Sequence, residues 1–158
     1  MQPAPIQTMS TIADITVQTR LRRIVLMVEC KFSRDASKAA AARVRDRLLD
    51  GYIEVPADSF FMLALGLNFH LWLPGTANDA LPTFTADATP VLRPYLGRLA
   101  DRLPWPGAEA MQISVFSWLA ELARGVDEPG PFDAEQMMVS SGLYDVMKHC
   151  TVQCEVPP

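Results

Sequence analysis

The stretch Ile24–Phe32 reads IVLMVECKF and is the strongest strand signal in the chain. Its first five residues are apolar, which is typical of a buried strand, and the residues after them alternate between charged and apolar. Because side chains alternate across a strand, Glu29 and Lys31 are expected on one face of the sheet and Cys30 on the other. A carboxylate and an ammonium group would then lie side by side where a hydrophobic strand ends.

A second acidic residue lies on the preceding predicted strand. Ile12–Val17 is rich in β-branched residues, and the polar segment after it predicts a turn into an antiparallel hairpin. A loop with an even number of residues, either Leu21-Arg22 or Thr19–Arg22, places Asp14 on the same face as Glu29, whereas an odd loop separates them. Two converging carboxylates would offer the oxygen ligands that Mg²⁺ prefers.

Local signals predict the remaining elements. A helix is expected over Lys38–Asp50, because Ser37 can cap its start and Gly51 can end it. The polar, proline-bearing residues 76–90 predict a surface loop. Apolar runs and helical spacing predict strands over Ser59–Leu65, Phe69–Leu73 and Val152–Val156, and helices over Val91–Leu103, Ala108–Arg124, Asp133–Val139 and Ser141–Met147.

This element order predicts a mixed α/β fold, with a central mixed sheet flanked by helices and a mostly helical C-terminal half. The length of 158 residues suits one domain, and no long linker interrupts it. We therefore expect a single domain over 1–158, in which residues 11–74 form the core and residues 91–158 form its helical part.

Charge is distributed unevenly along the chain. The net charge is −4, which by itself argues against a nucleic-acid binder. Residues 1–50 hold nine basic and five acidic side chains, whereas the rest of the chain holds five basic and thirteen acidic ones. The basic part also carries Asp14, Glu29 and Lys31, so positive charge accompanies the candidate site.

Cysteine usage and hydropathy restrict the protein class. Three cysteines without a secretory leader over Met1–Ser10 predict free thiols and a cytoplasmic protein. The strongest apolar stretch, Phe60–Leu73, is interrupted and shorter than the ~20 residues of a membrane span, so no membrane is expected as a partner. Only His70 and His149 are present, which argues against a multi-histidine metal centre.

The order of these motifs resembles the PD-(D/E)XK nuclease superfamily, in particular its small bacterial, restriction-endonuclease-like members. Ala13-Asp14 stands where the family often has Pro-Asp, and Glu29 and Lys31 match its Glu-x-Lys motif. The helix and the paired strands that follow, the second ending in Leu-Trp, add to the likeness. The resemblance covers residues 11–74 and implies a restriction-endonuclease-like core.

The resemblance also implies an activity, the metal-dependent hydrolysis of phosphodiester bonds in nucleic acid, DNA before RNA. Asp14 and Glu29 would hold Mg²⁺ or Mn²⁺, and the backbone carbonyl of Cys30 would add a ligand. Lys31 would position or activate the attacking water and stabilise charge on the phosphate.

Basic side chains of the front half are the expected nucleic-acid contacts. Ordinary solvated ion pairs are an equal alternative for Arg43 and Arg47, because Asp46 and Asp50 lie three or four residues from them. The expected phosphate contacts are Arg20, Arg22, Arg23, Lys38, Arg43, Arg45 and Arg47.

Two other functions remain open. The nuclease fold can serve as a non-catalytic subunit that binds a protein partner, and the aromatic hairpin Phe60–Trp72 could then lie at a sheet edge that the partner covers. A homodimer or larger complex is expected because no counterpart of the family's first helix precedes Asp14. A third function is neutralisation of a basic partner by acids of the C-terminal half, namely Asp127, Glu128, Asp133 and Glu135.

Overall fold

A six-stranded mixed sheet forms the centre of the protein. The computed structural model describes residues 13–98 and 106–155 of the chain. The strand order is β5-β4-β3-β2-β1-β6, in which β2 and β3 are parallel and all other neighbours are antiparallel. The strands are β1 (Ile15–Gln18), β2 (Ile24–Lys31), β3 (Phe60–Leu65), β4 (Asn68–Trp72), β5 (Phe84–Asp87) and β6 (Thr151–Cys154).

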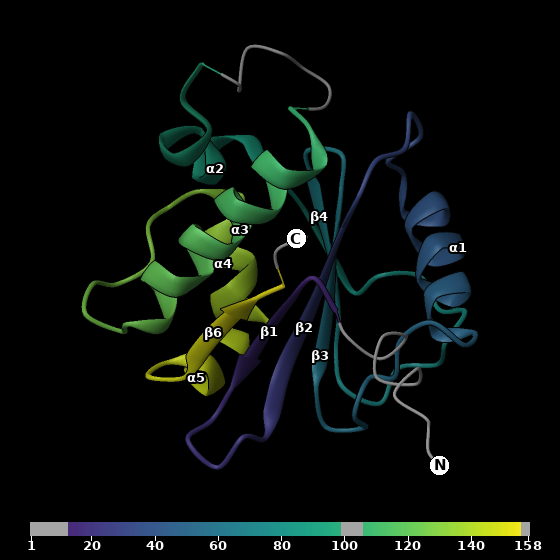
Figure 1. Cartoon of the computed structure of the whole chain (residues 1–158), viewed down its shortest axis with the longest axis horizontal. Helices are drawn as coiled ribbons and strands as arrows, with labels where there is room; N and C mark the ends of the chain where they lie inside the picture. Colours follow the sequence, from purple (N-terminus) through teal and green to yellow (C-terminus); the bar gives the residue numbers. More distant parts are fainter. Residues whose placement is uncertain (1–12, 99–105, 156–158) are drawn as a thin grey trace, which may run out of the picture.

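Helices cover the two faces of the sheet unequally. One helix, α1, lies on one face, and α2 to α5 gather on the other (Figure 1). This arrangement confirms the expectation of a mixed sheet flanked by helices. The helices are α1 (Lys38–Leu49), α2 (Thr89–Leu96), α3 (Ala108–Ala123), α4 (Asp133–Ser140) and α5 (Leu143–Met147).

Helix α1 connects the parallel strands β2 and β3, as a parallel pair requires. The hydroxyl of Ser37 accepts a hydrogen bond from the N–H of Ala40 at 3.2 Å, so the predicted N-cap is confirmed. The helix ends at Leu49, one residue before the predicted end, and Gly51 follows with a φ of 101°. The capping serine and the terminal glycine therefore predict the bounds of α1 to within one residue.

The sheet separates two apolar clusters. The larger cluster joins the strands to α2–α5, and within it the ring of Phe69 stacks on Trp118 with centroids 5.1 Å apart. The smaller cluster lies under α1, around Phe61 and Trp72. Burial on both faces explains why β2 and β3 are nearly continuous apolar runs.

The aromatic hairpin lies inside the sheet rather than at its edge. Every residue of β3 is buried. Strand β4 pairs along its other edge with β5, which forms within the segment 76–90 that we expected to be a surface loop. The predicted edge position of Phe60–Trp72 is therefore wrong, because β5 and β6 are the edge strands.

The C-terminal half differs from expectation in its boundaries. Helix α2 begins two residues before Val91 and ends at Leu96, before Gly97, with Pro94 inside it. The remainder of the predicted helix, residues 99–103, lies outside the described residues, as do Ile12 and Val156. Strand β6 pairs with β1, so the helical half also contributes to the sheet. No helix in the described ranges is long and apolar enough to cross a membrane.

Candidate metal centre

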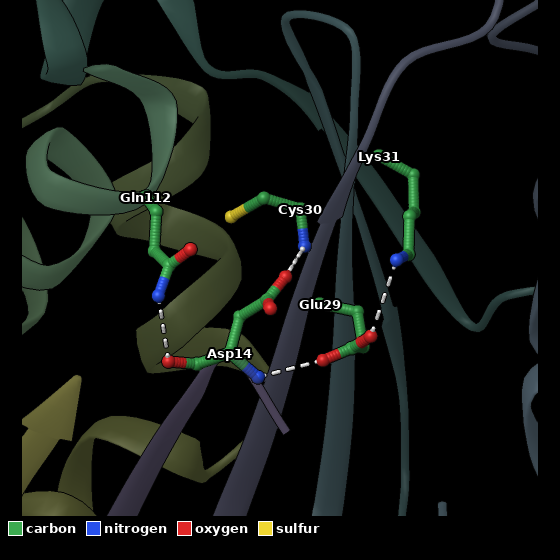
Figure 2. Close-up of polar contacts among 5 residues, drawn as sticks. All are labelled: Asp14, Glu29, Cys30, Lys31 and Gln112. Atoms are coloured by element: carbon green, nitrogen blue, oxygen red, sulfur yellow. Dashed lines mark hydrogen bonds and ion pairs between the residues drawn. The ribbon is translucent and has the colours of Figure 1, made fainter. Parts of the chain in front are cut away.

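Asp14 lies opposite Glu29, just before the first residue of β1. Ile15 pairs with Val28 at the end of the antiparallel ladder, so Asp14 and Glu29 are the next residues outward on the two chains. The N–H of Asp14 donates to Oε2 of Glu29 at 2.6 Å, and Oδ2 of Asp14 accepts from the N–H of Cys30 at 2.8 Å (Figure 2). The predicted juxtaposition of the two acidic residues is therefore present.

The hairpin reaches this pairing in a way that we did not predict. The N–H of Thr19 donates to the carbonyl of Arg23, and the N–H of Arg22 donates to that of Thr19, both at 2.9 Å, which closes an odd, three-residue loop. Both expected even loops are therefore wrong. A β-bulge at Val25 shifts the register between Val17 and Gln18, and this extra residue brings Asp14 beside Glu29 despite the odd loop.

Lys31 extends from the same face of β2 as Glu29. Its Nζ lies 3.7 Å from Oε1 of Glu29. The lysine side chain is 44% exposed and the glutamate side chain only 6%, so the pair joins a buried carboxyl to a solvent-facing ammonium. The prediction that both residues share one face is confirmed, and Figure 2 shows the lysine reaching toward the glutamate.

The pKa of the Glu29 carboxyl lies near neutral pH. Burial raises its pKa from 4.5 to about 7, and the charge of Asp14 adds to the rise. The hydrogen bond from the Asp14 N–H and the charge of Lys31 lower the pKa, but burial outweighs them. Glu29 therefore exchanges a proton near pH 7, as groups that take part in catalysis or metal binding often do.

Two carboxylates and one carbonyl are the groups of this site that could serve as metal ligands. The N–H and C=O of one strand residue point to the same side, so the carbonyl of Cys30, like its N–H, is directed toward the end of β1 where Asp14 lies. Within residues 13–98 and 106–155, no group of three or more His, Cys, Asp or Glu could hold an ion. Mg²⁺ commonly uses one or two carboxylates, with waters and substrate phosphates completing the shell, so two carboxylates and a carbonyl suit it.

Gln112 of α3 is a member of the site that the sequence did not reveal. Its side chain is buried, and its amide nitrogen donates to the carbonyls of Asp14, at 3.2 Å, and of Glu155. The N–H of Glu155 also donates to the Asp14 carbonyl at 2.8 Å. The backbone that carries the Asp14 carboxylate is thus attached to α3, as Figure 2 shows, and also to the residue that follows β6. The sequence signal that could have identified Gln112 is weak: it is a glutamine next to the apolar Met111 within a predicted helix.

Cys30 takes no part through its side chain. The thiol lies on the opposite face, in the apolar cluster beneath α2–α5. Burial raises the pKa of this thiol well above its usual value, so it stays protonated. The described cysteines are all free, as expected.

The predicted nucleic-acid contacts are dispersed. Arg20 and Arg22 belong to the hairpin loop, which lies at the opposite end of β2 from Glu29. Strand β2 has eight residues and spans about 23 Å. Arg23 pairs with Asp58 at 3.6 Å in an exposed ion pair. Lys38, in contrast, opens α1 shortly after the strand that carries Lys31.

Helix α1 does not present its arginines as one surface. Arg43 forms an exposed ion pair with Asp35 at 3.7 Å rather than with the helical acids, and Arg47 is exposed in the last turn. Arg45 is only 4% exposed and donates to backbone carbonyls of residues 76–78, so its predicted contact with surface phosphates is wrong. These carbonyl acceptors and the ring faces of Trp72 and Phe61 accommodate the buried guanidinium.

Comparison with known proteins adds no relative. No family model matches the chain, and no curated protein or solved structure matches it significantly. The functional inference therefore depends on the geometry of Asp14, Glu29, Cys30 and Lys31.

Proposed function

We propose that this protein is a metal-dependent nuclease that hydrolyses phosphodiester bonds in nucleic acid, DNA before RNA, through a restriction-endonuclease-like core. One observation carries the proposal: the Glu29 carboxyl accepts from the Asp14 N–H at 2.6 Å, with the Lys31 ammonium 3.7 Å from the same carboxyl. This arrangement agrees with the resemblance of residues 11–74 to the PD-(D/E)XK superfamily.

Each residue has a distinct part in the proposed reaction. Asp14, Glu29 and the Cys30 carbonyl would hold Mg²⁺ or Mn²⁺, which when bound lowers the pKa of water and offsets charge on the phosphate. Lys31, with its exposed ammonium, donates hydrogen bonds to the attacking water and to a phosphate oxygen. Gln112 holds the Asp14 backbone and thereby positions its carboxylate.

The proton of Glu29 links this chemistry to pH. A carboxyl whose pKa is about 7 must release its proton before it can bind a cation, so divalent metal binding displaces a proton at or below neutral pH. Cleavage at limiting metal concentration should therefore rise as the pH passes through 7 and level off above it.

Cleavage of plasmid and single-stranded DNA with Mg²⁺ or Mn²⁺ tests the proposal. Replacing Lys31 by Ala removes the ammonium beside the carboxylates and should lower the rate by about 10²-fold or more. Lys148→Ala, which removes an exposed lysine of the C-terminal half, is the matched control and should leave the rate unchanged. Equal rates in the wild type and Lys31→Ala would assign the cleavage to a contaminant and reject the proposal.

The two alternative functions receive less support from the structure. The scaffold hypothesis relied on an aromatic hairpin at the sheet edge, and β3 and β4 are interior strands. Among the acids of the neutralisation hypothesis, Glu135 is engaged in the turn before α4, where it accepts from the N–H of Gly130 at 2.9 Å. The scaffold hypothesis, a non-catalytic subunit that binds a protein partner, is favoured if the protein neither binds a divalent metal ion nor cuts nucleic acid.

A further inference from the structure

Strands β1 and β6 leave a polar part of the sheet open to solvent on the side of α1. Ile15 and Val17 of β1 point into the cluster beneath α2–α5, and because side chains alternate along a strand, the residues that alternate with them point the opposite way. Those residues are half-buried on β1 and exposed on β6, and none of them is charged. In the pairing of the two strands, they are Thr16 opposite Gln153 and Gln18 opposite Thr151.

A groove follows this face from the metal centre to the hairpin loop. Its first part is a hollow of about 840 Å³ that begins at Ala13, beside the metal centre. Its second part is a hollow of about 480 Å³ that reaches Arg20 and Arg22 in the loop. Gln18 and Gln153 line both hollows, so the two parts adjoin.

The two parts of the groove differ in chemistry. The part near the metal centre has apolar side chains of α3 in its wall, the exposed Ile113 and the half-buried Phe116. The part near the hairpin loop is polar and carries the exposed Arg20 and Arg22. In the part of the chain that the structure describes, neither of these arginines forms an ion pair with a carboxylate, unlike Arg23. Their charges are therefore available to an anion.

We propose that this groove binds a single strand of nucleic acid, with a base against Phe116 and backbone phosphates on Arg20 and Arg22. Proteins that follow a single strand combine a positively charged groove with aromatic side chains on which unpaired bases stack. Between the two ends, the amide and hydroxyl groups of β1 and β6 can donate hydrogen bonds to phosphate oxygens. A duplex keeps its base faces stacked on one another, so it cannot offer one to Phe116.

The groove gives the proposed nuclease a substrate class and a length requirement. Asp14 and Gln18 are four residues apart along β1, a distance of about 13 Å, and Arg20 lies beyond them. A strand with its scissile phosphate at the metal centre therefore reaches Arg20 only if it continues for several nucleotides. The substrate class rests on the proposed function, because the metal centre is taken as the point of cleavage, whereas binding in the groove needs no cleavage.

Fluorescence anisotropy without divalent metal measures binding apart from cleavage. The probe is a fluorescein-labelled oligothymidylate of about 16 nucleotides, whose bases do not pair. The double variant Arg20→Ala, Arg22→Ala should bind it about tenfold or more weakly, and should flatten the slope of log K against log salt concentration by about 1.4, because each phosphate contact to a single strand contributes about 0.7. An unchanged slope would overturn the groove as the binding site.

A matched control also loses two exposed positive charges. The double variant Arg124→Ala, Lys148→Ala changes the net charge equally but alters only the C-terminal half, so its affinity and salt slope should equal those of the wild type. A loss as large as that of the Arg20, Arg22 variant would show that net charge, and not the groove, governs binding.

Two further measurements separate the single strand from the duplex and the groove from the nuclease. A duplex of the same length should compete for the labelled strand at least tenfold less well than the single strand, and equal competition would overturn the assignment to single strands. Binding that depends on Arg20 and Arg22 without any cleavage in Mn²⁺ would reject the nuclease and keep the groove. Cleavage at equal rates in the wild type and the Arg20, Arg22 variant would keep the nuclease and reject the groove.

Discussion

The two faces of the sheet differ in what they bury. The face covered by α2–α5 holds the larger apolar cluster, and α3 adds the buried polar residues Gln112 and Ser114 to that side. The face covered by α1 alone holds the smaller cluster and buries Glu29, Arg45 and His70. Both clusters thus exclude water, but the buried Glu29, Arg45 and His70 all lie on the side of α1.

The difference suggests a division of labour between the faces. Apolar burial stabilises a domain by about 25 cal/mol for each Å² removed from water, so the larger cluster is the main source of stability. Buried ionisable groups oppose folding unless they are paired, and they persist where their chemistry is needed. The following substitutions test this division, from the largest expected effect to the smallest.

Leu119→Ala should be the most damaging substitution. Leu119 is fully buried on α3 in the larger cluster, and such a truncation removes apolar contacts and leaves a cavity, at a cost of about 2–5 kcal/mol. Urea unfolding measures this loss. Ile113→Ala, on the same helix but 45% exposed, is the control and should cost less than about 1 kcal/mol. Similar losses for both variants would remove the distinction between core and surface on α3.

Glu29→Gln, unlike Leu119→Ala, should increase the free energy of unfolding at alkaline pH. The folded-state pKa of Glu29 is raised from 4.5 to about 7, so the stability that its proton contributes is complete below pH 4.5 and lost as pH rises through 7. At about 1.4 kcal/mol per pKa unit, the wild type should lose roughly 3 kcal/mol that the glutamine variant keeps. Unfolding at pH 5 and pH 8 measures the difference.

The exposed Glu128 supplies the matched control for this prediction. Glu128→Gln should show no pH-dependent change relative to the wild type. If Glu29→Gln is destabilising to the same extent at pH 5 and pH 8, the Glu29 carboxylate is not the unfavourable buried charge that we infer.

Gln112→Leu should weaken the attachment of α3 to the backbone of Asp14 and Glu155. The leucine keeps the bulk of the side chain but leaves the Glu155 carbonyl without its donor and weakens the hold on Asp14, at a cost of about 1–3 kcal/mol. Thermal unfolding measures this cost. Ser114→Ala, a buried position two residues along α3, should cost less, and a larger loss there would contradict the assigned role.

Ser37→Ala should have the smallest effect. It removes the acceptor for the Ala40 N–H at the start of α1, which typically costs about 1 kcal/mol. Ser37→Asp retains an acceptor and should behave like the wild type in urea unfolding. A loss in the aspartate variant as large as in the alanine variant would show that the cap does not stabilise α1.

Local signals predicted most elements because each depends on neighbouring residues. Ser37 and Gly51 delimit α1, and the apolar run from Ile24 identifies β2. Strand β5 was missed because it forms only where β4 offers a partner, and its residues Phe84–Asp87 show no strong strand pattern. Such dependence on distant partners is the usual limit of pattern-based prediction.

Asp14, Glu29 and Lys31 lie together as predicted, but the path that unites them differs from the one we expected. The predicted face of Asp14 depended on loop parity, and a bulge at Val25 compensated for an odd loop that contains the non-glycine Arg22 at a φ of 65°. Nothing in the local sequence marks that bulge. Arg45 was misjudged and Gln112 was overlooked for another reason, because polar side chains on helices are assumed to face water unless distant acceptors hold them.

Binding of Mn²⁺ at pH 6 and pH 8 tests most directly whether Asp14 and Glu29 form one metal centre. Calorimetry of the wild type should show one ion whose affinity rises about tenfold with pH, as the proton leaves Glu29. Asp14→Asn and Glu29→Gln should each abolish this binding, while Glu128→Gln should not. Wild-type affinity in Asp14→Asn or Glu29→Gln, or none in the wild type at pH 8, would contradict the metal centre.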